Sequence, residues 1–166
     1  MQQAGFQSRV VYEAVPQVSS LLAEHSGRID YVDAWATPIL ADDAADAASW
    51  YAAVLKSTPR WVVRLMDIRN RLVKIVGLKA APTTSILDEG FPLIATTKDE
   101  TVSGLDDKHL DFRLSLRCED GEAVITTTVT LHNRLGQAYW AVIRPFHGRV
   151  VAGLLRHTGP VSLTSR

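Results

Sequence analysis

The sequence predicts an α+β domain in which a curved antiparallel sheet of six or seven strands wraps around a C-terminal helix, with two helices after the first strand. Residues 91–144 contain short runs of alternating apolar and polar side chains separated by polar turns, which is typical of antiparallel strands. Residues 145–159 instead begin with proline and end with glycine, as many helices do. One face of the predicted sheet is strongly apolar, and this last helix is the natural element to cover it.

The composition describes one domain with balanced charge. A chain of 166 residues is long enough to bury a substantial core. Its 18 basic and 18 acidic residues cancel and form no block of like charge, so we expect no nucleic-acid partner. Cys118 is the single cysteine, which excludes an intramolecular disulfide and an all-cysteine metal site. No stretch resembles a signal peptide or a membrane span, so we expect a cytoplasmic protein with no membrane partner.

The N-terminal part is expected to contain an arm followed by a first strand. Residues 1–28 are weakly patterned and are interpreted as an N-terminal arm with a short helix around residues 18–25. Residues 29–166 are expected to form a single domain. Alternation after Ile29 predicts its first strand, which Pro38 ends.

Two helices are expected after this strand. An alanine-rich stretch with acidic residues at its start predicts a helix from about Asp43 to Leu55. Thr58 is a suitable N-cap for the second helix, with Pro59 at its first position. Apolar residues then recur at intervals of three and four as far as Gly77, which is placed where a helix ends.

Five antiparallel strands are expected in the second half, before a closing helix of about three turns. In chain order these strands are FPLIATT, ETVSGL, HLDFRLSLR, EAVITTTVTLH and QAYWAVIR. In the helix that follows them, Phe146, Val150 and Leu154 fall on one face.

The Asp120-Gly121 dipeptide is a strong signal for a short hairpin and fixes the pairing of two strands. The pairing is the same whether the loop has two or four residues. One face is then apolar, with Leu110 opposite Leu131, Phe112 opposite Val129 and Leu116 opposite Ile125. The other face is polar, with His109 beside His132, Asp111 beside Thr130, Arg113 beside Thr128 and Ser115 beside Thr126.

The next run, QAYWAVIR, extends both faces if the loop from Asn133 to Gly136 has four residues. Trp140 then joins the apolar face, while Tyr139 lies beside Thr130 on the polar face. A bulge at Gly136 would exchange these two assignments.

The apolar face and the closing helix are expected to enclose a cavity for an apolar or amphipathic ligand, because a sheet curling around a helix commonly leaves space between them. Arg69, in the second helix, flanks a buried stripe, and His147 lies in the first turn of the closing helix. The candidate ligand-binding residues are Phe112, Val129, Trp140, Phe146, His147, Val150, Leu154 and Arg69.

Two of these residues, Arg69 and His147, each have more than one possible role. Arg69 can meet a ligand carboxylate, or its guanidinium can reach the surface or the end of a strand. His147 can act as an acid or base at the pocket mouth, or can simply cap or pack the helix.

The polar face is a second candidate site. His109, Asp111 and His132 have the residue types of a two-histidine, one-carboxylate metal triad. Arg113 on the same face favours an ion pair with Asp111 instead, so no metal is assigned. The remaining interpretations are a solvated face and the interface of a homodimer, and the candidate residues are His109, Asp111, Arg113, Thr130, His132 and Tyr139.

No cofactor is expected from motifs. The sequence lacks the glycine-rich patterns of dinucleotide and nucleotide sites, the H-E-x-x-H zinc pattern, the G-x-S-x-G nucleophile pattern and C-x-x-C. Standard dinucleotide, nucleotide and hydrolase chemistries are therefore disfavoured.

The order of a strand, a helix pair, a long antiparallel sheet and a C-terminal helix is similar to the helix-grip architecture of the Bet v 1 or START-like superfamily, whose members hold apolar ligands between sheet and helix. Over about residues 29–157 the chain also resembles the bacterial domain-of-unknown-function family 2867. The segments that carry this resemblance are DYVDAW, RWVVRLMDIRNRLV, GLDDKHLDFRLS, TTTVTLHNRLGQAYW and RPFHGRVV. The resemblance implies an architecture and brings no established reaction. Plant ligand carriers close with a much longer helix, so the short closing helix expected here implies a shallower pocket.

Three functions follow from the sequence. The first is a small-molecule binding domain for an apolar or amphipathic ligand. The second is an enzyme of lyase, cyclase or hydrolase type that uses the histidines of the pocket or of the sheet face. The third is a noncatalytic, dimeric interaction module that works through the polar face.

Overall fold

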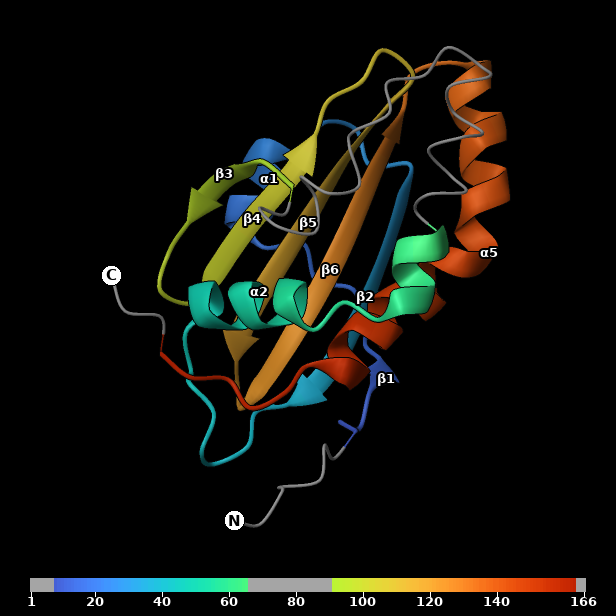
Figure 1. The fold of residues 1–166 in the computed structure, drawn as a ribbon. Helices are drawn as coiled ribbons and strands as arrows, with labels where there is room; N and C mark the ends of the chain where they lie inside the picture. The colour runs from blue at the N-terminus through green and yellow to red at the C-terminus, as the bar shows by residue number, and fades with distance from the viewer. Residues whose placement is uncertain (1–7, 66–90, 164–166) are drawn as a thin grey trace.

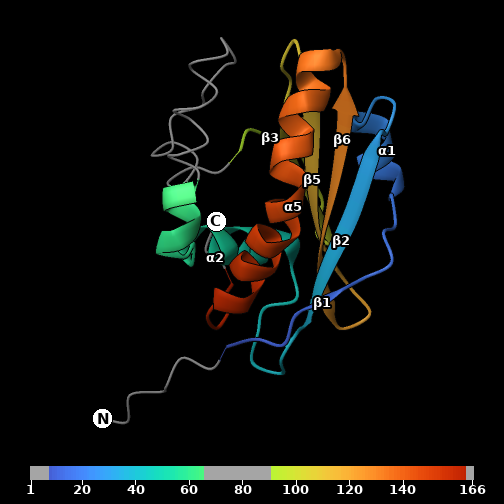
Figure 2. The same cartoon turned by 90° about the vertical axis from the view of Figure 1, so that its right-hand side faces the viewer.

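The computed structural model describes residues 8–65 and 91–163, and these form a sheet with helices on both of its faces. Helices α2 (Ala47–Lys56) and α5 (Arg134–His157) cover one face, and the short helix α1 (Ser20–His25) covers the other (Figures 1 and 2). We call the face beneath α2 and α5 the inner face and the opposite one the outer face. The α+β class, the antiparallel sheet and the C-terminal helix are as the sequence predicts.

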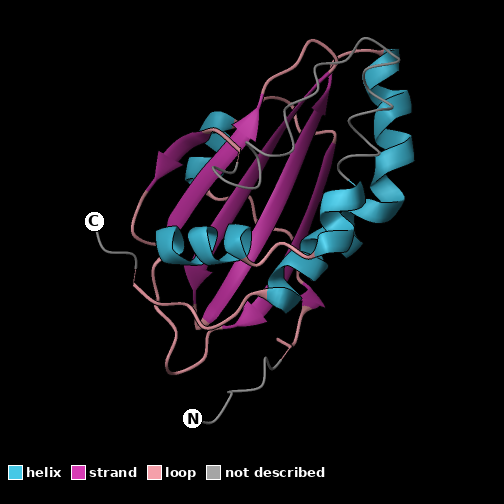
Figure 3. Ribbon diagram, viewed as in Figure 1, coloured by secondary structure: helices cyan, strands magenta, loops and turns pink. Residues whose placement is uncertain are grey.

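The sheet of the described residues has six strands, each antiparallel to its neighbours (Figure 3). Their order across the sheet is β1 (Tyr12–Glu13), β2 (Tyr31–Pro38), β6 (Glu122–Leu131), β5 (Leu110–Glu119), β4 (Glu100–Leu105) and β3 (Leu93–Thr96). The predicted first strand corresponds to β2, and four of the five strands predicted in the second half correspond to β3, β4, β5 and β6. The two-residue strand β1, within the N-terminal arm, was not predicted.

The hairpin of β5 and β6 has the predicted register. Leu110 pairs with Leu131, and Phe112 pairs with Val129. The loop has two residues, and both Asp120 (φ 52°) and Gly121 (φ 79°) adopt the left-handed conformation. A two-residue turn with two positive φ angles matches the right-handed twist of the flanking strands, which explains why the Asp-Gly pair determines the register.

The core lies between the inner face and the two long helices. Trp50 and Val54 of α2 and Val151 and Leu155 of α5 pack in one cluster with inner-face side chains such as Ile125. Helix α2 starts later than the predicted Asp43, because the side chain of Asp46 accepts a hydrogen bond from Ser49 N and acts as the N-cap.

The prediction of a strand for QAYWAVIR is wrong, because these residues form the first half of α5. The expected hairpin loop is a helix cap, in which the Asn133 side chain accepts hydrogen bonds from Leu135 N and Gly136 N, both at 3.1 Å. Pro145, interpreted as the helix start, lies inside the helix. Figure 1 shows α5 bending partway along its length, which is the usual effect of an internal proline.

Helix α5 therefore has 24 residues and is much longer than the three turns expected. The expectation of a shallow pocket, which followed from a short helix, loses its basis. The buried side of α5 also differs from the predicted stripe. Trp140, Val151 and Leu155 are buried, whereas Phe146 is 47% exposed.

The N-terminal arm packs on the domain at two places. The predicted short helix is present as α1, where the Ser19 side chain caps Leu22 N. Further upstream, Arg9 is buried and forms a two-pronged ion pair with Asp43, both hydrogen bonds being 2.8 Å long. The arm is thus held to the loop before α2 as well as to the outer face.

The second predicted helix is only partly described. Residues 60–65 are helical, and Val62 N donates to Pro59 O at 3.0 Å. Arg69 and the expected stop at Gly77 lie outside the described residues. Among the helices that are described, none has both the length and the apolar character needed to cross a membrane.

Candidate functional site

Buried polar side chains gather where β2 and β6 face α5. Alternation along β2 points Tyr31, Asp33 and Trp35 to the inner face, because these residues pair with the inner-face positions of β6. Asp33 is directly opposite Thr127. A carboxylate therefore lies in the middle of a face that is otherwise largely apolar.

The Asp33 carboxylate is held from both sides. Its Oδ2 accepts hydrogen bonds from the Tyr31 hydroxyl at 3.1 Å and from Trp35 Nε1 at 3.4 Å. Its Oδ1 faces His147 Nε2 of α5 at 3.3 Å, with side-chain exposures of 8% for Asp33 and 16% for His147. The pair thus joins the sheet to the helix in a nearly enclosed position.

This environment changes the acid–base properties of the sheet residues. Burial raises the pKa of Asp33, but its interactions with His147 and the hydrogen bonds from Tyr31 and Trp35 outweigh burial and leave the pKa below its ordinary value. Burial, followed by the charge and hydrogen bond of Asp33, raises the pKa of Tyr31 to about 12. At neutral pH Asp33 is therefore ionised. Tyr31 stays protonated, and its hydroxyl donates a hydrogen bond to Asp33.

Aromatic rings surround the pair. Tyr31 meets Trp140 edge to face, with ring centroids 4.8 Å apart, and Trp140 lies 5.3 Å from the His147 ring. The Arg144 guanidinium is 5.2 Å from the centroid of the Tyr31 ring. At Gly148 an added Cβ would come within 2.7 Å of the Trp35 ring. Glycine at this position lets α5 lie close against Trp35.

Four buried polar atoms of this region have no hydrogen-bond partner within the described structure. They belong to residues of β2, β6 and α5, which we call the inner polar cluster: Asp33 (Oδ1), Thr127 (Oγ1), Trp140 (Nε1) and His147 (Nε2). The contact between Asp33 and His147 has ion-pair distance but not hydrogen-bond alignment. Unpaired buried polar groups are rare and call for an explanation.

The predicted pocket residues do not share one environment. Val129 and Trp140 are buried, and Phe112, His147, Val150 and Leu154 are half-buried. Phe146 is on the exposed side of α5, and Arg69 lies outside the described residues. Apolar side chains toward one end of the inner face are also half-buried, namely Leu105, Leu110, Phe112 and Leu131.

The outer face is largely covered by the chain's own arm. Arg113 Nε donates to His25 O at 2.7 Å, and the hydroxyls of Ser26 and Thr128 are 3.0 Å apart. The Thr130 hydroxyl donates to Arg28 O. Arg113, Thr128 and Thr130 of the predicted polar face thus bond to residues 25–28, and the homodimer stays a prediction.

The histidines of the outer face find separate partners. His132 Nε2 is 2.9 Å from Asp111 Oδ2, whereas His109 Nδ1 is 3.1 Å from Asn133 Oδ1. The expected ion pair between Arg113 and Asp111 does not form, since Arg113 pairs with Asp106. Among the described residues, no set of three or more histidine, cysteine, aspartate or glutamate side chains is placed to hold a metal.

Tyr139 belongs to α5, so its predicted position in a strand beside Thr130 is wrong.

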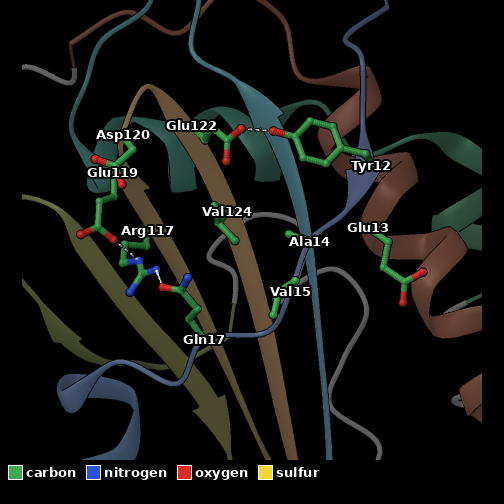
Figure 4. Close-up of a pocket in the computed structure, with 10 residues that line it drawn as sticks. All are labelled: Tyr12, Glu13, Ala14, Val15, Gln17, Arg117, Glu119, Asp120, Glu122 and Val124. Carbon is green, nitrogen blue, oxygen red and sulfur yellow. Dashed lines mark hydrogen bonds and ion pairs between the residues drawn. The ribbon is translucent and has the colours of Figure 1, made fainter.

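A separate pocket of about 350 Å³ lies on the outer face beneath the arm (Figure 4). It is lined by Tyr12, Glu13, Ala14, Val15, Gln17, Arg117, Glu119, Asp120, Glu122 and Val124. The Tyr12 hydroxyl donates to Glu122, and Arg117 bridges Gln17 and Glu119, so polar side chains of the wall largely satisfy one another. This pocket lies on the opposite side of the sheet from the inner polar cluster.

Sequence reasoning identified His147 and Trp140 but missed their partners on β2. A signal was present, since Asp33 has the same alternation as Tyr31 and therefore had to share a face with it. A carboxylate on the inward side of a strand is uncommon unless it has a partner. The identity of that partner could not be predicted, because His147 is more than a hundred residues away in the chain.

The free energy of unfolding of Asp33→Asn is expected to fall less steeply than that of the wild type as the pH is lowered. The folded state lowers the pKa of Asp33, so this carboxylate stabilises the fold above the ordinary aspartate pKa of about 3.9, and its contribution is lost as the pH falls through the lower folded value. Urea unfolding of both proteins between neutral pH and pH 3 measures the difference. An equally steep acid loss in Asp33→Asn would contradict this assignment.

Comparison with known proteins gives one family match. A family model described as "Protein of unknown function (DUF2867)" matches residues 25–154. The matched region runs from the end of α1 through most of α5, so it contains the whole inner polar cluster. No curated protein and no solved structure matched the chain.

Proposed function

We propose, for a chain that belongs to the DUF2867 family, that the domain binds a small amphipathic molecule between the inner face of the sheet and α5. The proposal includes a helix-grip arrangement, in which the sheet and the C-terminal helix hold the ligand between them. The family brings no reaction with it, so the proposal is argued from the site.

The observation that carries the proposal is the inner polar cluster. Buried donors and acceptors normally have partners, and an unpaired one weakens the fold by about 1–3 kcal/mol. Thr127 Oγ1 and Trp140 Nε1 have no polar partner within the described structure, and Asp33 Oδ1 and His147 Nε2 face each other at 3.3 Å without hydrogen-bond alignment. These atoms on facing elements are best explained as groups that bond to a bound molecule. The polar end of the ligand would therefore lie beside these atoms, under α5.

The neighbouring side chains suit an apolar ligand body. The residue row Tyr31, Val129, Phe112 and Leu105 crosses the inner face next to the row that contains Asp33 and Thr127. Phe112 and Leu105 in this row are half-buried, so further apolar surface can be covered when a ligand binds. Small-molecule sites commonly combine such apolar walls with a few fixed polar groups.

Wild-type protein is expected to bind a neutral hydrophobic dye such as Nile red saturably, and to melt at a higher temperature with the dye bound, because a ligand of the folded state stabilises it. Trp35 and Trp140 lie at the site, so intrinsic fluorescence provides an independent readout. Phe112→Ala should weaken binding several-fold, since it removes an apolar wall.

Val124→Ala is the matched control, because Val124 lies on the same hairpin but lines the outer-face pocket. It should leave the affinity unchanged. The proposal fails if no saturable binding is found. It also fails if Val124→Ala weakens binding while Phe112→Ala does not, which would place the dye on the outer face.

The Asp33–His147 pair supports acid–base catalysis on the bound molecule as a second candidate function. A buried aspartate that faces an imidazole can orient it and stabilise its protonated form, and such a histidine can move protons to or from a substrate. Incubation of a bound ligand with the protein, followed by mass spectrometry, tests this function. Turnover by the wild-type protein that is lost in His147→Gln would support catalysis. Recovery of the unchanged ligand would contradict catalysis and leave binding as the proposed function.

A further inference from the structure

We propose that the polar end of the ligand is a neutral hydroxyl group, so that the site selects an aliphatic or alicyclic alcohol and rejects the corresponding carboxylate and amine. This inference rests on the proposed binding function. It follows from the kinds of donor and acceptor that remain unpaired around Asp33.

The acceptor of the cluster is an oxygen of an ionised carboxylate. Tyr31 and Trp35 both donate to Oδ2 of Asp33, whereas Oδ1 faces His147 Nε2 at 3.3 Å without hydrogen-bond alignment, so Oδ1 is the oxygen that can still accept from a ligand. An ionised aspartate offers acceptors and no donor. A ligand carboxylate placed here would meet a like charge in a poorly solvated position, where Coulomb repulsion is strong.

The donor of the cluster is the indole of Trp140. Its Nε1–H can only donate, and it is buried without a partner in the described structure. A ligand ammonium group has no acceptor to offer it. An ammonium group could therefore donate to Asp33 but would leave the indole without a partner.

A hydroxyl group satisfies both requirements at once. It can donate to Asp33 Oδ1 and accept from Trp140 Nε1–H, because a hydroxyl oxygen carries one proton and two lone pairs. The Thr127 hydroxyl can donate or accept, so it can complete the arrangement in either role. The carbon attached to this hydroxyl would continue along the apolar row through Val129 and Phe112.

The test compares three ligands with the same ten-carbon chain, namely 1-decanol, decanoate and decylamine, at neutral pH. Dissociation constants are measured by tryptophan fluorescence and checked by calorimetry. We expect 1-decanol to bind wild-type protein at least about 10-fold more tightly than decanoate, which meets the like charge of Asp33, and more tightly than decylamine, which leaves the Trp140 donor unpaired.

Two variants test the named groups. Asp33→Asn removes the charge and adds an amide donor, so it should improve the affinity for decanoate relative to 1-decanol by about 10-fold or more. Trp140→Phe keeps an aromatic ring but removes the donor, and it should weaken 1-decanol binding about 2- to 10-fold, the usual range for one hydrogen bond. Glu122→Gln removes an acid from the outer-face pocket and should change none of the three affinities.

The outcomes separate the ligand class from the binding function. The inference is overturned if decanoate or decylamine binds wild-type protein as tightly as 1-decanol, a result that needs no variant to fold. It is also overturned if folded Asp33→Asn, checked by circular dichroism, keeps the wild-type preference. If neither the neutral dye nor any of the three ligands binds, the proposed binding function itself fails. That result is expected if the inner polar cluster holds only water.

Discussion

Replacing Arg9 by alanine is expected to lower the free energy of unfolding by about 3–5 kcal/mol, because it leaves the Asp43 carboxylate buried without its counter-charge. The two side chains are only 5% and 3% exposed. Arg9 also donates to Thr158 O and Gly159 O, both at 2.8 Å, and its guanidinium lies 4.6 Å from the centroid of the Trp50 ring. One side chain therefore connects the arm, the loop before α2 and the segment after α5.

Urea unfolding of Arg9→Ala measures this loss, and Arg28→Ala is the matched control. Arg28 also pairs with an aspartate, Asp30, but their side chains are 71% and 25% exposed, so solvent screens the pair and removal of Arg28 should destabilise the fold far less than removal of Arg9. A double variant, Arg9→Ala with Asp43→Asn, should recover part of the stability, because the amide is neutral. An Arg9→Ala variant that unfolds within about 1 kcal/mol of wild type would show that the buried pair does not hold the arm in place.

Local signals accounted for much of the sheet. Asp120 and Gly121 specify a turn with two positive φ angles, and that turn fixes which residues of β5 and β6 are partners. Once the register is known, alternation assigns every side chain of the hairpin to a face. The β5–β6 part of the fold was therefore predictable because one short-range feature determines it.

The first half of α5 was not predictable in the same way. Trp140, Val142 and Ile143 are residues that strands favour, and Pro145 is most common at a helix start, so local preference indicated a strand followed by a helix. Tertiary packing prevailed, because a continuous helix can bury Trp140 against Tyr31 and place His147 beside Asp33. The Asn133 cap was the local signal that favoured the correct assignment.

The candidate site could likewise be predicted only in part from the sequence. His147 and Trp140 were identified as candidates, but the sheet residues that complete the site come from β2, far away in the chain. Sequence alone also could not show that residues 25–28 bond to Arg113, Thr128 and Thr130 of the polar face, which was a candidate interface. In both cases the missing information is which distant segments pack together, and no local pattern carries it.

Gly136→Ala is expected to destabilise the protein by about 2 kcal/mol or more, although alanine is the better helix former by about 1 kcal/mol. A Cβ at this position would lie 2.0 Å from the His109 carbonyl oxygen and 2.9 Å from its carbon. That oxygen already accepts a hydrogen bond from His132 N at 2.9 Å, so it cannot move without disturbing the end of the β5–β6 ladder. The start of α5 would have to shift away from the sheet instead.

Gly159→Ala is the control for this substitution, because a Cβ there meets no atom within 4 Å. It should change the stability by no more than about 0.5 kcal/mol. Thermal unfolding of both variants gives the comparison, and each kcal/mol lost corresponds to a drop of about 2–4 °C in Tm for a domain of this size. A Tm of Gly136→Ala equal to that of wild type would mean that the cap of α5 is not pressed against His109, and the position of Trp140 and His147 over Asp33 would then lose its anchor at this end of the helix.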